Sequence, residues 1–523
     1  MSDQDGSVAL SYHNATKHSE VSIRMSGHYL DWDNKPSPFK VYKNLTSTPL
    51  PHDFPRPMAE SLNAIKGEAS GDSSQPIDLG HLAEVLFFSA GLTRKMRIGG
   101  EIHYMRAASA TGALYPIELY IISSGIHGLD PGAYHFNPLS FSLVRIREGD
   151  YSAELADATS EATTSSPLTI VFTSLAWRNA WKYEARSYRH WFWDAGVIAA
   201  NLLATCSSEH IKSKLLMGFT DHRMDQLLGL KSGQEATVAL APIGEIKPVQ
   251  RAQSSLAVTD LDLDTEPLSR EQVDYPIMRE TNKASELQSR ADIELWRNSL
   301  KEAPPSEGGN DPSFPIQSSK QKTPSLAEVI LRRGSTRKFA QRAISYDVLS
   351  MVIDASTGPI PLDFLSKDES LIEFYFIAND VDGLSAGSYH FDRRSRSLKQ
   401  LKEGKLRYVS GYLCLEQLLF SDASVVFFLM TDLHQVLSSL GSRGYRAAQF
   451  EAGIRAGKIY LSSYAEGIGA SGSTFYDDAV TEFFSPHAKG LSTMIAVGIG
   501  VPGYKARPGR VLATANPPRR TDK

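Results

Sequence analysis

Two long stretches of this 523-residue chain repeat each other, and this repeat constrains the fold more than any other feature of the sequence. The segment IELYII at residues 117–122 recurs as IEFYFI at 372–377, and GAYHF at 132–136 recurs as GSYHF at 387–391. Further matches follow in the same order, at offsets of 255 to 257 residues. A repeat of this length predicts two copies of one domain rather than a solenoid of short units.

Each copy has the pattern of an α+β domain. Short β-branched segments bounded by turn residues predict strands, and the clearest are the two segments above together with TIVF at 169–172 and SVVF at 424–427. Residues 191–206 and 448–465 are long and apolar without alternation, so they predict buried helices. The chain is therefore expected to hold two α+β domains in tandem.

The repeat also sets the predicted domain boundaries. Residues 1–80 have no partner in the second copy, and we expect them to form an arm over the core. The segment between the copies contains EAPPSEGGNDPSFP, which is typical of a linker, and a short helix is expected near ADIELWRNSLK. The predicted organisation is an N-terminal arm over 1–80, a first domain over 81–246, a linker over 247–324, a second domain over 325–510 and a disordered tail over 511–523.

Composition narrows the class of protein. The 55 basic and 59 acidic residues leave a formal net charge of −4, which argues against a general nucleic-acid binder. Two cysteines, Cys206 and Cys414, are too few for a disulfide scaffold or a Cys-rich metal site. The first residues lack the pattern of a secretory leader, and no run of about 18 apolar residues predicts a membrane span. The expectation is a cytoplasmic protein without a metal, a nucleic-acid partner or a membrane partner.

Two basic clusters lie in the second copy. The first is RRGSTRK at 332–338, at the end of a helix predicted over 326–333, and the second is YKAR at 504–507, after the last strand. Guanidinium and ammonium groups at such spacing suit a phosphate or an anionic ring edge. The alternative for each cluster is a solvated basic surface.

Two loops of small residues could bring backbone N–H groups close to a ligand. The loop RAASATGALYP at 106–116 precedes a strand of the first copy, and GIGASGSTFYDD at 467–478 lies in the second. The alternative is an ordinary tight turn in both cases. Moved by 255 residues, Arg106 and Ser109 fall on Pro361 and Phe364, and no basic cluster stands in the first copy opposite residues 333–337. Each copy thus keeps half of a site, as expected for one composite site between two domains.

The segment RNAWKYEARSYR at 178–189 contains both shared and unshared residues. Its Arg-x-Tyr-Arg element at 186–189 recurs at 443–446, which predicts salt bridges and packing at a helix start. Lys182 and Tyr183 do not recur, since Ser439 and Leu440 stand in their place. An ammonium beside a phenol can act as a base or an acid if its surroundings lower the pKa. The alternative is a surface lysine beside a packed tyrosine.

At these residues the sequence resembles the FMN-dependent nitroreductase superfamily, and most of all its azoline dehydrogenase branch (SagB/ThcOx type) in a tandem-domain form. RRGSTRKF resembles the opening Arg-x-Ser-x-Arg/Lys element of that superfamily, and YKAR resembles its closing Lys-x-Arg element. RAASATGALYP resembles its Pro-Ser-x-Gly-Ala loop, with Ala108 in place of the proline and Thr111 in place of a smaller residue. The resemblance implies two domains, each a mostly antiparallel sheet flanked by helices, that form a pseudo-dimer within one chain.

The same resemblance implies roles for individual residues. FMN would be held by Arg333, Ser335, Arg337, Lys505 and Arg507 of the second copy and by Arg106, Ser109, Thr111 and Gly112 of the first. Ser473 and Thr474 would lie near flavin N5, and Lys182 and Tyr183 would take part in catalysis.

Three functions are consistent with the resemblance. The first is FMN-dependent dehydrogenation of a thiazoline- or oxazoline-like substrate, small or bound to a peptide or carrier, alongside biosynthetic partner enzymes. The second is NAD(P)H-driven reduction of nitro compounds or quinones, and the third is a non-catalytic flavin-binding subunit. Lys182 and Tyr183 favour the first over the second, and the intact half-sites disfavour the third. A monomer could hold the complete site.

Overall fold

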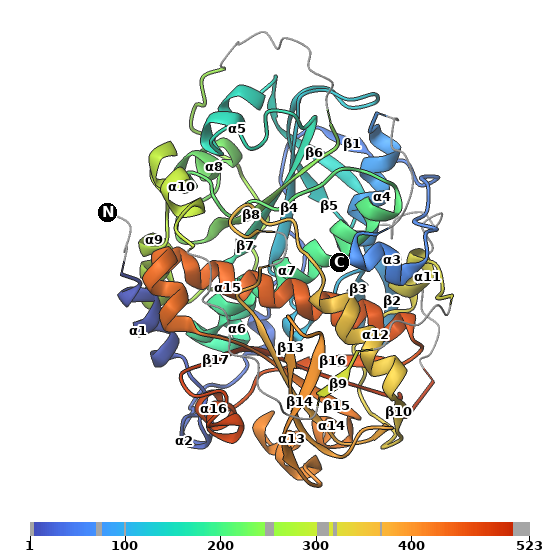
Figure 1. Cartoon of the computed structure of the whole chain (residues 1–523). Coiled ribbons are helices and arrows are strands. Elements are labelled where there is room, and N and C mark those ends of the chain that lie inside the picture. The colour runs from blue at the N-terminus through green and yellow to red at the C-terminus, as the bar shows by residue number, and fades with distance from the viewer. Residues whose placement is uncertain are drawn as a thin grey trace.

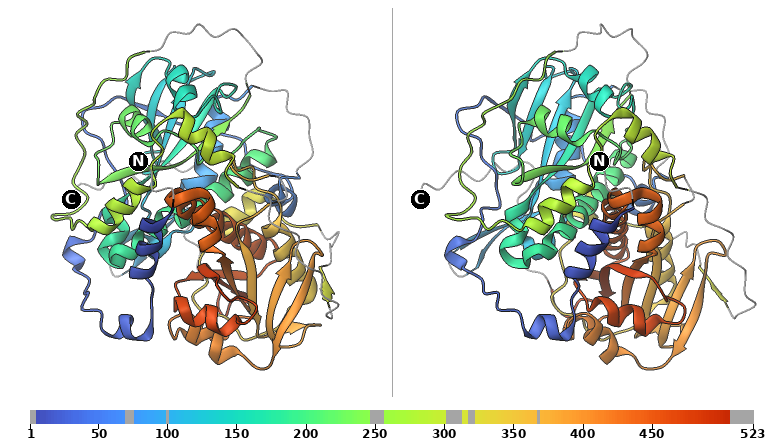
Figure 2. Two further views of the ribbon diagram at one scale, coloured as in Figure 1. Left: turned by 60° about the vertical axis from the view of Figure 1, so that its left-hand side comes forward. Right: turned by 90° about the vertical axis from the view of Figure 1, so that its left-hand side faces the viewer.

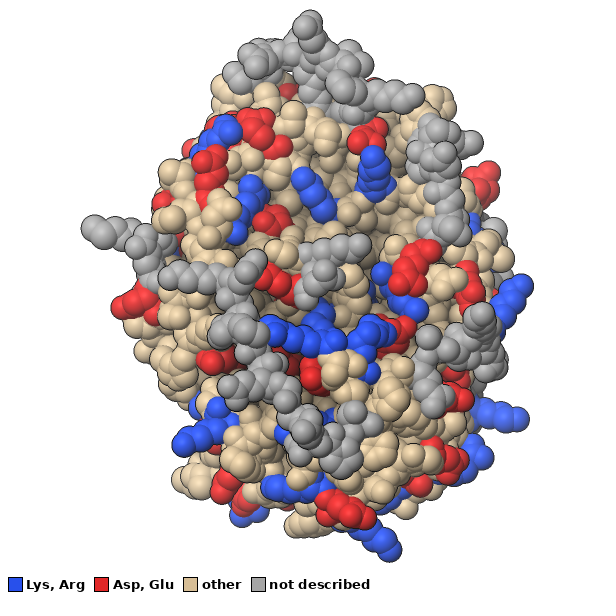
Figure 3. All heavy atoms as spheres, viewed as in Figure 1, with Lys and Arg blue, Asp and Glu red and all other residues tan. Residues whose placement is uncertain are grey.

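The computed structural model describes residues 5–68, 76–98, 101–245, 256–300, 313–316, 322–366 and 369–505. It forms two lobes, one built mainly from residues before 250 and the other from the second copy (Figure 1; Figure 2). On the face shown in Figure 3, basic and acidic side chains lie interspersed. Within the described ranges, no helix combines the length and the apolar character of a bilayer-spanning segment.

The first lobe contains a six-stranded antiparallel sheet in the order β1-β6-β5-β4-β7-β8. Its central pair runs from Ile117 opposite Ser174 to Ser123 opposite Leu168. The predicted strand segments IELYII and TIVF form this pair. The strands are β1 (Ser47–Pro49), β4 (Ile117–Ser123), β5 (Gly132–Asn137), β6 (Ser142–Glu148), β7 (Leu168–Leu175) and β8 (Glu235–Ile243).

The second lobe contains a seven-stranded antiparallel sheet in the order β16-β17-β15-β11-β13-β14-β9. Here IEFYFI and SVVF form the corresponding central pair, β11 and β15. The expectation of two similar α+β domains is therefore confirmed. The strands are β9 (Ser313–Pro315), β11 (Glu373–Ala378), β13 (Gly387–Asp392), β14 (Ser397–Glu403), β15 (Val425–Thr431), β16 (Gly469–Ser473) and β17 (Ser492–Gly500).

Two central helices, α7 (Tyr188–Ser208) and α15 (Leu433–Ala465), cross between the sheets and contain the predicted buried helices (Figure 1). They touch at Gly196 and Gly453, which match each other in the repeat. A Cβ on Gly196 would lie 2.6 Å from backbone atoms of α15, and a Cβ on Gly453 would lie 2.6 Å from the Trp193 carbonyl oxygen. Only glycine permits so close an approach of the two backbones.

Shorter elements surround this core. The helices before the linker are α1 (Ser7–Ala15), α2 (Glu20–Arg24), η1 (Trp32–Asn34), α3 (Ser61–Lys66), α4 (Leu79–Ala90), η2 (Thr111–Ala113), α5 (Ser152–Ala158), α6 (Ala176–Tyr183), η3 (Glu184–Ser187) and α8 (Asp221–Leu228). The later ones are α9 (Pro276–Ala284), α10 (Arg290–Arg297), α11 (Leu326–Arg332), α12 (Tyr346–Thr357), α13 (Arg407–Leu413), α14 (Leu418–Asp422) and α16 (Asp477–Phe484). Two small sheets pair β2 (Leu92–Ile98) with β3 (Glu101–Arg106) and β10 (Ile344–Ser345) with β12 (Val381–Asp382).

Two buried ion clusters join the domains, and both use the duplicated Arg-x-Tyr-Arg element. Arg186 of η3 and Arg189 of α7 donate to Asp477 at the start of α16, at 2.9 and 2.8 Å. In the mirror arrangement, Arg443 and Arg446 of α15 donate to Asp221 at the start of α8, at 2.6 and 2.7 Å. The structural role predicted for this element is confirmed. Burial alone would raise the pKa of Asp477, but the two arginines outweigh burial and hold the pKa below its ordinary value.

Residues 7–18 of the N-terminal arm have a structural counterpart in the segment predicted as a linker. Helices α1 and α9 have nine residues each and lie in contact at the domain boundary. The carbonyl oxygens of His13 and Thr16, at the C-terminal end of α1, accept from Arg189 and Arg186. Those of Asn282 and Ser285, at the C-terminal end of α9, accept from Arg446 and Arg443. His18 and Leu287 then make matching hydrogen bonds with Asp477 and Asp221. The predicted linker segment thus includes a second copy of part of the arm, together with a helix, α10, near the expected position.

We predict that Asp477→Asn lowers the free energy of unfolding by about 3 kcal/mol, because it leaves two buried guanidinium groups facing a neutral side chain. Asp478→Asn is the matched control, since Asp478 is exposed and pairs with Lys17 at the surface. It should change stability by less than about 0.5 kcal/mol. Denaturant unfolding followed by circular dichroism measures both. Equal midpoints for Asp477→Asn and the wild type would contradict the prediction.

Candidate functional site

The predicted half-sites of the two domains meet at the domain boundary, and Arg333 connects them. Its guanidinium is buried, with Nε donating to the Ala107 carbonyl at 2.8 Å and Nη2 to the Arg106 carbonyl at 3.0 Å. The opening element of the second domain is therefore fixed directly to the loop of the first. The side chain of Arg106 turns away to the Pro38 carbonyl, at 2.6 Å, and stacks over the Tyr115 ring.

Asp194 of α7 accepts hydrogen bonds from the loop that precedes β4. The backbone N–H of Thr111 donates to both Asp194 carboxylate oxygens, at 2.9 and 3.1 Å, and its hydroxyl donates at 2.8 Å. Gly112 follows with φ of 62°, in the left-handed region. A Cβ there would lie 2.7 Å from Tyr183 Oη, so a glycine lets the Tyr183 ring pack against the loop.

Lys182 and Tyr183 end α6 beside this loop, and both are half-buried. Lys182 Nζ lies 5.3 Å from the centre of the Tyr183 ring. Burial lowers the pKa of Lys182, and the positive charges of Arg337 and Lys35 lower it further. Burial and the charge of Asp194 raise the pKa of Tyr183, which Arg337 opposes. Arg337 of the second domain thus lies within electrostatic reach of both residues of the first.

The opening and closing elements of the second domain lie side by side. Phe339 forms a β-bridge with Pro502, and Gly503 N–H donates to the Lys338 carbonyl at 2.8 Å. The backbone N–H of Arg337 donates to Tyr504 Oη at 3.1 Å, so Arg337 lies next to the residue that precedes Lys505, and both cationic residues are exposed. No carboxylate in the described ranges forms an ion pair with either. Arg507 lies outside the described residues.

Tyr460 of α15 contacts the second-domain loops of the candidate site. The sequence does not single it out, because it lies in a long buried helix and belongs to no recognisable motif. Gly472 N–H donates to Tyr460 Oη at 2.6 Å, and Ser335 Oγ lies 3.5 Å from the same oxygen. Ser473 Oγ donates to the Thr474 carbonyl at 2.6 Å. Thr474 Oγ1 is buried and has no hydrogen-bond partner among the described residues.

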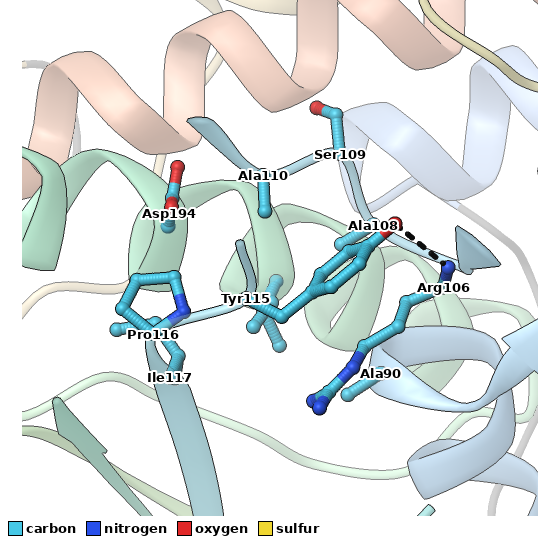
Figure 4. A pocket seen from close by; sticks show the side chains of 10 residues that line it. Ala90, Arg106, Ala108, Ser109, Ala110, Tyr115, Pro116, Ile117 and Asp194 are labelled. Carbon is cyan, nitrogen blue, oxygen red and sulfur yellow. Dashed lines mark hydrogen bonds between the residues drawn. The ribbon is translucent and has the colours of Figure 1, made fainter. Parts of the chain in front are cut away.

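A water-sized cavity of about 10 Å³ lies under the first-domain loop (Figure 4). Asp194, Ile198 and Tyr115 line it, and Figure 4 shows the hydroxyl of Ser109 turned away from it. At the corresponding place in the second domain, Arg455 pairs with Glu451, which accepts from the Leu371 N–H at 2.8 Å. Asp194 stands at the position of Glu451, but it has no cationic partner among the described residues. Burial therefore raises the pKa of Asp194 to about 7. The repeat pairs these two carboxylates, so Asp194 could have been found from sequence.

Helix α10 occupies the position that corresponds, by the repeat, to the candidate site. Trp296 is buried, donates from Nε1 to the Leu440 carbonyl at 3.2 Å and packs its ring 5.1 Å from that of Phe364. Leu440 is the counterpart of Tyr183, and Phe364 is that of Ser109. Trp296 therefore lies against the counterparts of two predicted site residues.

Arg297, the next residue of α10, covers the neighbouring edge. Its Nε donates to Asp363 at 2.7 Å, and Asp363 accepts from the N–H groups of Met217 and Gly218, at 2.8 and 3.0 Å. These two residues are the counterparts of Ser473 and Thr474. The edge formed by Met217 and Gly218 is thus covered, so of the two equivalent edges only the one at Ser473 and Thr474 could face a ligand.

Comparisons with known proteins agree with this architecture. Residues 73–245 match the model of the nitroreductase family. Two relatives are named as putative nitroreductases. The first, a crystal structure from Anabaena variabilis, is 26% identical, with coverage of 95% of this chain and 99% of that chain and a TM-score of 0.76. The second, from Methanocaldococcus jannaschii, is 25% identical over 173 residues, which are 33% of this chain and 82% of the relative.

Within the described part of the chain, no group of three or more His, Cys, Asp or Glu side chains could hold a metal ion.

We predict that Asp194 makes stability fall as pH rises. Its native pKa of about 7 exceeds the ordinary 3.8, so the folded state keeps a proton that the unfolded chain has released. Its contribution is fully present below pH 4 and is lost as pH rises through 7. The side chain in Asp194→Asn cannot titrate. The free energy of unfolding of this variant should therefore increase relative to that of the wild type as the pH rises from about 4 to 7.

Urea unfolding at a series of pH values measures this difference. Asp130→Asn, at an exposed position, is the control and should run parallel to the wild type. Parallel curves for Asp194→Asn and the wild type would contradict the assignment.

Proposed function

We propose that this chain is a flavin-dependent oxidoreductase that binds one FMN between its two domains, since residues 73–245 match the nitroreductase family model and the whole chain resembles a putative nitroreductase. The proposal rests on one observation. Arg337 of the second domain lies within electrostatic reach of Lys182 and Tyr183 of the first, and the Tyr183 ring packs on Gly112 of the loop.

The residues at the cleft fit a flavin nucleotide. Arg337 and Lys505 are exposed cations that suit a phosphate or the anionic edge of a ring, and Arg507 follows them in sequence. Thr474 Oγ1 is an unpartnered buried hydroxyl at the edge expected to face the ring. Arg333 and Arg106 donate to backbone carbonyls, so we assign them to holding the loop, with Arg337, Lys505 and Arg507 as the phosphate contacts. Bound FMN supplies a hydride acceptor at N5.

The roles of Lys182 and Tyr183 follow from the opposite directions of their pKa shifts. The pKa of Lys182 is lowered, which favours a neutral amine able to accept a proton. The pKa of Tyr183 is raised, which keeps the phenol protonated and able to donate a hydrogen bond. We assign Lys182 as the base and Tyr183 as the group that orients the substrate.

These roles favour dehydrogenation. A thiazoline- or oxazoline-like ring, free or bound to a peptide or carrier, would give a hydride to the flavin and a proton to Lys182. Reduction of nitro compounds or quinones by NAD(P)H is the alternative, and it requires no protein base for hydride delivery. A non-catalytic flavin-binding subunit would not require the unshared Lys182-Tyr183 pair at all.

We predict one FMN per chain, because α10 occupies the counterpart of the candidate site. The absorbance of flavin released from a known amount of protein gives the ratio, and a value near two would contradict the composite site.

Arg337→Ala should weaken FMN binding by about ten- to a hundred-fold through the loss of one charge-assisted contact. Lys338→Ala, at the next exposed position, should leave the affinity nearly unchanged.

We also predict that Lys182→Ala and Tyr183→Phe leave the bound flavin spectrum unchanged while turnover of a thiazoline falls by about 10²–10⁴-fold. Stopped-flow flavin reduction locates the lost step. Ser439→Ala, at the counterpart of Lys182, is the matched control and should react like the wild type. Reduction by NAD(P)H at wild-type rates in both variants, without thiazoline turnover by the wild type, would support the reductase instead.

A further inference from the structure

Residues 19–35, which we call the strap, expose an unusual number of large apolar side chains. Val21, Met25, Tyr29 and Trp32 are 70%, 79%, 81% and 65% exposed, and α2 within the strap has no buried residue. Soluble proteins rarely leave such a group of side chains in water without a use for it.

The strap runs from the predicted site residues of the second domain to those of the first domain. Near its start, Glu20 accepts from Tyr412 Oη at 2.6 Å, and Arg24 lies 3.5 Å from Glu416. The next residue, Gln417, donates to Ser473 at 2.9 Å.

Near its end, the strap contacts Trp181, which precedes Lys182. Trp181 Nε1 donates to the Asp31 carbonyl at 3.0 Å, and the Trp32 and Trp181 rings lie 5.4 Å apart. Lys35 is close enough to lower the pKa of Lys182. The strap therefore passes beside both sets of predicted site residues.

The chain contains a second copy of this segment in another position. Helix α1 corresponds to α9, and α2 corresponds to α10, each capped by a serine side chain, Ser19 or Ser289. Arg290 of α10 pairs at 3.2 Å with Glu161, the counterpart of Glu416, although Arg290 itself stands at the position of Glu20 rather than of Arg24. In Figure 1, α2 lies by α13 and α16, as α10 lies by α5 and α8.

The two copies differ in one respect. Helix α10 is eight residues long, buries Ile293 and Trp296 and occupies the counterpart of the candidate site. Helix α2 ends after five residues at Arg24 and stays at the rim. The same attachment thus supports an inserted and a withdrawn position.

We infer that the strap is a lid that closes over the cofactor cleft into the position that α10 holds at the counterpart of the candidate site, and that its apolar side chains form a wall of the substrate site. Closure over an apolar or aromatic substrate would remove these side chains from water. The tethers favour such motion, since the Arg24–Glu416 pair is largely exposed and such pairs contribute little. The lid rests on the proposed function only in that the cleft binds FMN.

Cross-linking of the FMN-loaded protein tests the lid. Ser26 corresponds to Trp296 and Ser109 to Phe364, so Ser26→Cys with Ser109→Cys should be joined within one chain by a short bismaleimide. The native Cys206 and Cys414 are buried and should not compete. Ser22→Cys with Ser109→Cys is the matched control, because Asp292, the counterpart of Ser22, is only half-buried on α10 and accepts a hydrogen bond from the Gln288 N–H. We expect at least a ten-fold faster cross-link for the first pair.

Three outcomes separate the possibilities. Equal rates for both pairs, with flavin absorbance intact, would overturn the lid and leave the proposed function standing. Cross-links between chains only would overturn it as well and assign the strap to contact between copies. Wild-type protein without flavin at saturating FMN would instead contradict the proposed function, and the rate comparison on the cysteine variants would still decide whether the strap closes.

Discussion

The two buried carboxylates, Asp477 and Asp221, are each neutralised by arginines of the other domain. A buried ion is costly unless it is paired, and here each domain holds two guanidinium groups whose partner it lacks. Neither domain could bury this surface alone without leaving charges uncompensated. The pairing of the domains is thus part of their folding, and the crossing of α7 and α15 at Gly196 and Gly453 follows from the same contact.

This crossing fixes the geometry of everything at the boundary. Asp194 and Tyr460 project from the two crossing helices and hold the loops on either side of the cleft. Arg333 then fastens the second domain to the loop of the first. The cleft edges are therefore set by rigid helices rather than by the loops themselves, which is the arrangement that a precise binding site requires.

Much of this could be predicted from the sequence. The repeat identified both domains, the central strands and helices, and the structural role of the Arg-x-Tyr-Arg element. The equivalence of α1 and α9 could not be predicted, because their shared contacts use backbone carbonyls of His13, Thr16, Asn282 and Ser285, which leave no trace in residue identity. Arg333 lies in a motif that indicates a ligand contact. The motif alone does not reveal that two N–H groups of Arg333 donate to the loop of the other domain. The occupation of the counterpart of the candidate site by α10 depends on Trp296 and Arg297, which no offset relates to a site residue.

This occupied counterpart also bears on how such a chain can change over time. When one domain assembles with an identical copy, every substitution appears at both symmetric positions, so a tryptophan that blocks one site blocks both. Fusion of the two copies in one gene removes that restriction. Trp296 can block one site while the other keeps its glycine loop and its Lys182-Tyr183 pair, and each half is free to specialise without the other.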